Sequence, residues 1–161
     1  MRYCSKAHRG TPPRWAAFEV SAASTSALRR EGAAVEIRRG DIVLVDLRGV
    51  EGHEKAGVRP CLVVQNDAGN RSLPLTIVAP LTDARGKPDI PQLVPVTADE
   101  LGGYETKASV VDCGQLRTID VAARVVRALA RLGPDAMERV DRGLAASLGL
   151  TRPGRDKRPN T

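Results

Sequence analysis

Short apolar runs separated by turn residues dominate the sequence from about residue 40 onward. Runs rich in Val, Ile and Leu are typical of strands, and they occupy 41–47, 61–65, 75–81, 92–96, 109–112, 116–119 and 125–129. Gly49, Gly52, Gly57 and the segment 66–70 mark loops and turns between the first three runs. Many short strands at close spacing favour a compact antiparallel, barrel-like sheet.

One segment, 135–148, instead carries apolar residues at helical spacing. Met137, Val140, Leu144 and Leu148 recur every three or four residues and form one stripe. Pro134 suits the first turn of this helix and Gly149 suits its end. Short helices are also expected after Thr97, whose hydroxyl can cap 98–101, and at 120–124. The pattern as a whole predicts an α+β fold.

The two ends of the chain differ from the segment between them. Residues 1–37 are rich in Ser, Ala, Pro and Arg without periodicity, and residues 151–161 are polar and basic with two prolines. We expect a disordered basic extension and a disordered basic tail around a single domain at 38–150.

The net charge of +6 comes entirely from those ends. Lys and Arg exceed Asp and Glu by six to three in 1–37 and by four to one in 151–161, whereas 38–150 carries 15 of each sign. A nucleic-acid site in the domain must therefore be a local patch. Only four residues are aromatic, which disfavours a base-stacking platform.

Several functional classes are excluded by what the sequence lacks. The three cysteines form no CxxC pair, which argues against a disulfide framework and a zinc site and favours a reducing cytoplasm. No segment has the roughly 18 consecutive apolar residues of a membrane span. GxSxG, HExxH, phosphate-loop and two-metal carboxylate motifs are missing, so we expect no metal and no other cofactor. A ribonuclease using two histidines is excluded, because His8 lies in the extension and only His53 remains.

Five segments stand out in a fixed order. They are Arg39-Gly-Asp-Ile with its strand, Gly52-His-Glu-Lys-Ala-Gly-Val-Arg-Pro60, Thr82 at a strand end, Gln115-Leu-Arg-Thr-Ile-Asp120, and Ser147-Leu-Gly-Leu150. Together they resemble the MazF/PemK toxin family over 39–150.

The resemblance implies a homodimer of small SH3-like barrels with a C-terminal helix. Such toxins cleave single-stranded RNA, chiefly mRNA, at a short recognition sequence without a metal, and thereby inhibit translation and growth. An acidic, MazE-like antitoxin of the type II toxin–antitoxin system holds them inactive. By position, Arg59, Thr82 and Glu54 fall at catalytic sites. RNA-binding positions fall on His53, Lys55, Ser109 and Gln115.

These residue types suit metal-free cleavage, in which the substrate's own 2'-hydroxyl attacks phosphorus. Arg59 can stabilise the charge that grows on the phosphate, and Thr82 offers a stiffly held hydroxyl. Arginine is a poor proton acceptor, so Glu54 and His53 are the titratable candidates. We hypothesise that His53 contributes to proton transfer or to phosphate contact.

Without the resemblance, each residue also has an ordinary structural interpretation. Arg59 and His53 would be surface loop residues, Thr82 a strand end, and Glu54 a partner for Lys55 or Arg59. Arg117 and Asp120 are expected to be structural, as a strand-edge charge and a helix cap, and Cys61 and Cys113 as small core residues.

Two other functions remain open. A CcdB-like, non-enzymatic gyrase poison shares the barrel but lacks the combination of Arg59 and Thr82. An inactive SH3-like binding module is the second alternative, because His53, Lys55 and Gly114 depart from the family's pattern, Gly114 replacing an acidic residue.

Overall fold

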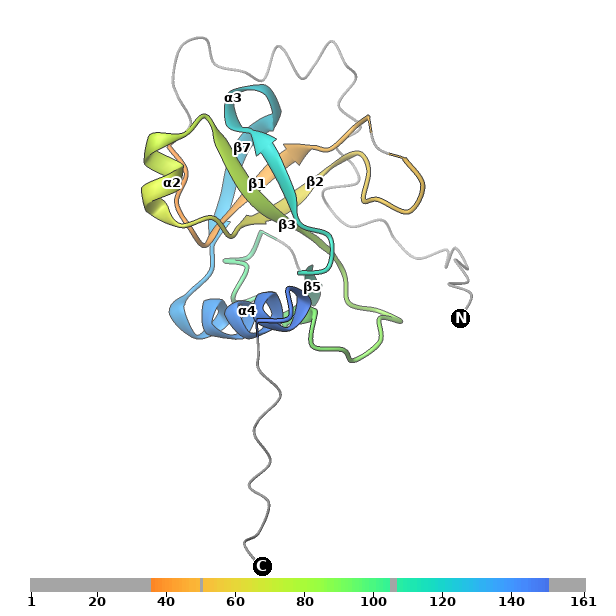
Figure 1. Ribbon diagram of the computed structural model, residues 1–161. Helices are drawn as coiled ribbons and strands as arrows, with labels where there is room; N and C mark the ends of the chain where they lie inside the picture. Colours follow the sequence, from red (N-terminus) through yellow and green to blue (C-terminus); the bar gives the residue numbers. More distant parts are fainter. Residues whose placement is uncertain (1–35, 50, 105–106, 151–161) are drawn as a thin grey trace, which may run out of the picture.

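The apolar runs form one antiparallel sheet of seven strands within the described part of the chain (Figure 1). The computed structural model describes residues 36–49, 51–104 and 107–150. The strands are β1 (Asp41–Asp46), β2 (Val58–Val63), β3 (Leu75–Asp83), β4 (Leu93–Val96), β5 (Ser109–Asp112), β6 (Arg117–Asp120) and β7 (Val125–Arg131). Their order is β4-β5-β3-β2-β1-β7, with β6 paired to β3. The disordered segments predicted at 1–37 and 151–161 lie outside the described residues except for Glu36 and Ile37. Ile37 is buried, so the packed domain includes at least this residue of the predicted extension.

In the described residues, three helices accompany the strands: α2 (Asp67–Ser72), α3 (Val121–Arg124) and α4 (Pro134–Ser147). The predicted C-terminal helix and the short helix at 120–124 are confirmed. Asp120 caps α3, because its carboxylate accepts a 2.7 Å hydrogen bond from the Ala123 N–H. No helix in the described residues has the length and apolar character needed to cross a membrane.

The prediction of a turn at 66–70 is wrong, because this segment begins α2. The Asn66 side chain accepts the Gly69 N–H at 2.8 Å and caps the helix. Asp67 also accepts the Arg39 N–H at 2.6 Å, which ties the first turn to the start of β1. Asn, Asp and Gly favour turns locally, but here they supply a cap and a tertiary anchor.

The predicted helix after Thr97 is also wrong, because residues 98–103 form hydrogen-bonded turns. Thr97 and Glu100 make the reciprocal contacts of a capping box: the Glu100 N–H donates to Thr97 Oγ1 at 3.2 Å, and the Thr97 N–H donates to Glu100 Oε2 at 2.9 Å. Gly102 and Gly103 then adopt positive φ angles and end the turn before a helix develops.

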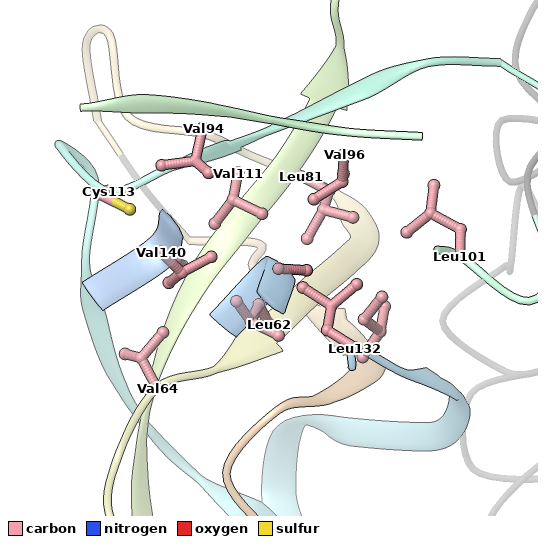
Figure 2. Packing of buried hydrophobic residues seen from close by; sticks show 13 residues of the cluster. Leu62, Val64, Leu81, Val94, Val96, Leu101, Val111, Cys113, Leu132 and Val140 are labelled. Atoms are coloured by element: carbon pink, nitrogen blue, oxygen red, sulfur yellow. The ribbon is translucent and has the colours of Figure 1, made fainter. Parts of the chain in front are cut away.

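Two buried clusters lie on the two faces of the sheet. One packs α4 and β4 against Ile42, Leu62, Ala79 and Leu81 (Figure 2). The other joins side chains of β1, β2, β3, β6 and β7, and it includes Ile37, Val43, Val45, Leu47, Cys61, Val63, Val78, Ile119 and Val125. We call this second set the strand core. Because β1 contributes to both clusters, it is buried on both faces.

The α4 helix packs closely at Gly143. A Cβ atom there would lie 2.5 Å from Val94 Cγ2 and 3.3 Å from Cys113 Sγ. Figure 2 shows Val140 pointing toward the same part of the cluster. Leu148, predicted to belong to the apolar stripe, is instead 58% exposed, because α4 ends at Ser147.

Two prolines mark where strand pairing changes. Val64 donates its N–H to Ile77 O of β3 at 2.9 Å. Backbone groups of alternate residues point to the same neighbour, so Pro60 also faces β3, where it has no N–H to donate. The β2–β3 ladder accordingly ends at Cys61 and Pro80. Beyond Pro80, β3 exchanges β6 for β5 as its partner.

An antiparallel sheet with a C-terminal helix is thereby confirmed. Among the described strands, the pairing runs from β4 at one end to β7 at the other. Closure of this sheet into an SH3-like barrel stays a prediction.

Candidate functional site

Arg59 of β2 and Thr82 of β3 each lie two residues beyond the last pair of the β2–β3 ladder, which joins Cys61 to Pro80. Beyond that pair, Thr82 is aligned with Val110 of β5. Arg59 alternates with Cys61 along β2, so both residues are on the face of the strand core. Thr82 shares that face, because it alternates with Pro80 and Val78. Arg59 lies within β2, which begins three residues earlier than the strand predicted at Cys61.

The Arg59 guanidinium is half-buried and held by its own loop. Its Nε donates to Ala56 O at 2.8 Å, and Nη2 donates to the same oxygen. Burial lowers the pKa of the Arg59 guanidinium from its usual value. A guanidinium partly removed from water interacts more strongly with an anion than one in bulk solvent. This arrangement suits Arg59 to bind a phosphate.

Gln115 anchors the loop of residues 51–57 to the turn between β5 and β6. Its Oε1 accepts the Lys55 N–H at 2.8 Å, and its Nε2 donates to His53 O at 3.3 Å. The far end of the loop is fixed by the Leu47 N–H, which donates to Gly57 O at 2.9 Å. Gln115 therefore has a structural role in this state, and it sets the position of the segment that leads to Arg59.

Lys55, Arg59, Lys87 and Asp112 form a charged group that we call the cationic cluster. Lys55 Nζ lies 3.8 Å from Asp112 Oδ2. Burial lowers the pKa of Lys55, and the nearby charges of Lys87 and Arg59 lower it further, against the opposite effect of Asp112. Two further cations and one carboxylate thus act on Lys55, although the domain as a whole is neutral. The cluster fits the local patch expected from the sequence.

The remaining predicted residues divide between the two sides of the sheet. His53 and Glu54 are exposed on the 51–57 loop, on the approach to Arg59. Ser109 is buried, and it pairs with Asp83 of β3 and Val96 of β4. Because side chains alternate, Ser109 lies on the face opposite Thr82. The structure does not bring the Ser109 side chain to Arg59.

Arg117 lies on the same face of the sheet as Arg59. It pairs with Val78 in the sheet, and its Nη1 donates to Leu47 O at 3.3 Å. The charges of Arg59 and Arg117 both act on Cys61, which is fully buried between them in the strand core. The contact with Leu47 O fits the structural role predicted for Arg117.

Sequence reasoning missed Asp112 and Lys87. Asp112 is the last residue of β5, and Lys87 follows β3 in a turn in which its N–H donates to Ala84 O at 3.2 Å. Both residues come near Lys55 only because β5 pairs with β3. The one available signal was the position of Asp112 at the end of a predicted strand, three residues before Gln115.

Comparison with known proteins gives a consistent result. Residues 38–148 match the family described as PemK-like, MazF-like toxin of type II toxin–antitoxin system. An "Endoribonuclease MazF" of Staphylococcus epidermidis is 44% identical over 115 residues, which is 71% of this chain and 92% of that protein.

Solved structures agree with the sequence match. MazF of Deinococcus radiodurans superimposes with a TM-score of 0.59 at 28% identity, covering 70% of this chain and 96% of that one. A mycobacterial endoribonuclease, solved in complex with its cognate antitoxin, gives a TM-score of 0.58 at 26% identity and covers 73% of this chain and 99% of that chain.

Proposed function

Because the chain belongs to the PemK-like, MazF-like toxin family of type II toxin–antitoxin systems and is an endoribonuclease, we propose that it cuts single-stranded RNA, chiefly mRNA, at a short recognition sequence without a metal. The observation that supports this proposal is that Arg59 and Thr82 share one face just beyond the end of the β2–β3 ladder, with the charge of Lys55 near Arg59. It acts in the cytoplasm, where cutting mRNA stops translation and growth.

The reaction is an attack by the substrate's own 2'-hydroxyl. The O2'–P bond forms, the P–O5' bond breaks, and the products are a 2',3'-cyclic phosphate and a free 5'-hydroxyl. The proton of the 2'-hydroxyl passes to a base, and the departing O5' takes up a proton. Because the nucleophile belongs to the substrate, the protein has to supply mainly positioning and charge stabilisation.

Arg59 binds the scissile phosphate and stabilises the charge that develops on its oxygens. Its contact with Ala56 O fixes the guanidinium before substrate arrives, so little reorganisation is needed. Thr82 presents a hydroxyl from a rigid, β-branched side chain on the same face as Arg59, and this hydroxyl can donate to a phosphate oxygen or orient the attacking group.

Glu54 and His53 are the candidates for proton transfer. Both are exposed on the 51–57 loop, a short distance along the chain from Arg59. Arg59 is the weaker candidate, since a guanidinium of lowered pKa still keeps its proton near neutral pH. Replacing His53 with Ala leaves activity unchanged across pH 5 to 8 only if Glu54 carries the step without it.

Lys55 and Lys87 bind phosphates next to the scissile one. The charges of Arg59 and Lys87 both act on Lys55, and ammonium groups bind phosphate without base preference. Gln115 contributes to RNA binding through the loop it anchors. The buried Ser109 supports the strand that carries Thr82 and contacts RNA only if that strand end moves.

Two protein partners belong to the same proposal. The chain acts as a homodimer, and an acidic, MazE-like antitoxin covers Arg59 in place of RNA. Support comes from the mycobacterial relative solved with its cognate antitoxin. Acidic side chains match a cluster of three cations as phosphates do.

Cleavage in EDTA tests the chemistry. The purified protein is incubated with a long single-stranded RNA, and cuts are mapped together with their end groups. We expect discrete cuts with cyclic phosphate ends, and Arg59→Ala should lower the rate by about 100- to 1000-fold. Glu138→Gln, on the exposed face of α4, is the folding-neutral control. Cuts that require added metal, or an Arg59→Ala variant that cuts at the wild-type rate, contradict the mechanism.

A further inference from the structure

Asp112 joins the sheet to the 51–57 loop, and the proposed reaction gives it no part. Asp112 of β5 pairs with Leu93 of β4, and its side chain is only 13% exposed. One carboxylate oxygen accepts the Gly114 N–H at 3.1 Å, while the other lies 3.8 Å from Lys55 Nζ. The Lys55 side chain is also largely covered, at 20% exposure. The contact is therefore a sheltered link between a rigid strand end and a loop.

Every other charge that faces Lys55 in the cluster is positive. Arg59 and Lys87 both disfavour the charged ammonium, as does its burial. Asp112 is the one group there that attracts it. Without this carboxylate, burial and like charge would drive the Lys55 side chain outward into water, where neither cost applies.

We infer that Asp112 is a positioning residue, whose carboxylate holds Lys55 and with it the 51–57 loop so that Glu54 and Arg59 face the scissile phosphate. The backbone contacts support the link. Lys55 donates its N–H to Gln115, three residues after Asp112, so the side chain and main chain of Lys55 are fixed to the same turn. This inference rests on the proposed function for its catalytic consequence.

The variant Asp112→Asn tests the charge alone, because the amide oxygen can still accept the Gly114 N–H. Removing a negative charge from a cationic cluster favours RNA binding. If Asp112 only weakened the attraction between the cluster and RNA, its removal would therefore lower KM and leave kcat unchanged. Loss of positioning instead lowers kcat. We expect kcat to fall roughly 3- to 10-fold with KM equal to or below that of the wild type.

A double-mutant cycle shows whether Asp112 acts through Lys55. In a Lys55→Gln background, Asp112→Asn should change kcat less than about 2-fold. Asp112→Glu, which restores the charge, should recover part of the lost kcat. Glu138→Gln is the matched control, since it also converts an ion-paired carboxylate to an amide, on α4. A kcat loss that persists without Lys55, or a change in KM alone, overturns the inference.

Hydrogen exchange at the Lys55 amide provides a readout independent of catalysis. This amide is hydrogen-bonded to Gln115, and we expect it to exchange roughly 3- to 10-fold faster in Asp112→Asn. Unchanged exchange contradicts the positioning role. If the wild type cut no RNA, the proposed function would fail, while the exchange rates would still decide whether Asp112 holds the loop.

Discussion

Cys61 shows how a single side chain near the site is kept chemically inert. It lies two residues after Arg59, fully buried in the strand core, and burial raises the pKa of its thiol to about 12. The charges of Arg59 and Arg117 lower that pKa, but by less than burial raises it. Since the thiolate is the reactive form, Cys61 remains an unreactive thiol despite its cationic neighbours.

We expect alkylating reagents to leave Cys61 unmodified in the folded protein at pH 8. The Cys4→Ser variant is treated with iodoacetamide under native and denaturing conditions, and its peptides are analysed by mass spectrometry. Cys113, whose pKa is likewise raised to about 12 by burial, should behave in the same way. Rapid native labelling of Cys61 would contradict its placement in the core.

At the residue scale, the candidate site residues that lie in one continuous motif could be predicted from the sequence. Those that come near the site only when the strands pair could not. Arg59 and Glu54 belong to a recognisable loop, and Thr82 ends a recognisable strand. Asp112 and Lys87 carry no local signal, because their relation to Lys55 depends on which strands become neighbours. Ser109 matches the pattern, yet its side chain lies on the opposite face, since one position along a strand reverses the face.

Among the structural elements, the turn after β4 owes its shape to Glu100. This carboxylate accepts hydrogen bonds from Thr97, and Arg139 of α4 donates to it at 2.6 Å. These contacts lower the pKa of Glu100 from its usual 4.5. Because the folded pKa is the lower one, the ionised side chain stabilises the fold fully above the unfolded pKa. That stabilisation is lost as pH falls through the folded pKa.

Glu100→Gln should therefore destabilise the protein by roughly 0.5 to 1.5 kcal/mol at pH 7. The free energy of unfolding is measured by urea denaturation from pH 7 down to pH 3. We expect the difference from the wild type to shrink as pH falls below about 4.5, the range in which the carboxyl takes up a proton first in the unfolded chain and then in the folded protein. A difference that stays constant over this range would show that charge plays no part.

The contact between α4 and the sheet depends on the absence of a side chain at Gly143. A methyl group there meets Val94 at 2.5 Å and the Pro91 carbonyl oxygen at 3.1 Å. Neither neighbour moves freely, because valine is stiff at its first side-chain torsion and the other group is backbone. The helix would have to shift away from β4.

Gly143→Ala should lower the free energy of unfolding by roughly 1 to 2 kcal/mol, since overpacking outweighs the better helix propensity of alanine. Arg142→Ala, at the exposed neighbouring position, is the control and should change stability by no more than about 0.5 kcal/mol. The free energies of unfolding of both variants and of the wild type are measured by urea denaturation. A Gly143→Ala protein more stable than the wild type would contradict the close packing.

Most helices and strands could be predicted from the hydrophobic pattern, but the helix α2 could not. The strand at 109–112 was predicted from its short run of apolar, β-branched residues, and the helix α4 because burial on one side imposes a period on the sequence. The helix α2 has no buried residue, so no period marks it. Its existence depends on the Asn66 cap and on the bond from Arg39 to Asp67, which joins positions far apart in the chain.

For the whole molecule, the location of charge matters more than its total. The domain at 38–150 is neutral, and the excess of six positive charges lies in the flanking segments. Within the domain, RNA affinity should come from the cationic cluster. Each phosphate contact releases counterions, so the contribution of one lysine is visible in the salt dependence of binding.

Lys87→Gln should reduce the slope of log affinity against log salt concentration by about 0.7, the value expected for one contact to a single strand. Binding of a single-stranded oligonucleotide is measured by fluorescence anisotropy between low and moderate salt. Arg142→Gln removes the same charge from the exposed side of α4 and should leave the slope unchanged. Equal slopes for all three proteins would place Lys87 outside the RNA path.

The missing N–H of Pro60 has a consequence for how the chain tolerates changes in length. Alignment of Arg59 with Thr82 depends on the β2–β3 ladder, which Pro60 ends at a fixed place. The connection at 66–74, including α2, has no part in that alignment. Residues added or lost there leave Arg59 and Thr82 on one face, whereas one residue inserted between Pro60 and Val63 would turn Arg59 to the other face of the sheet.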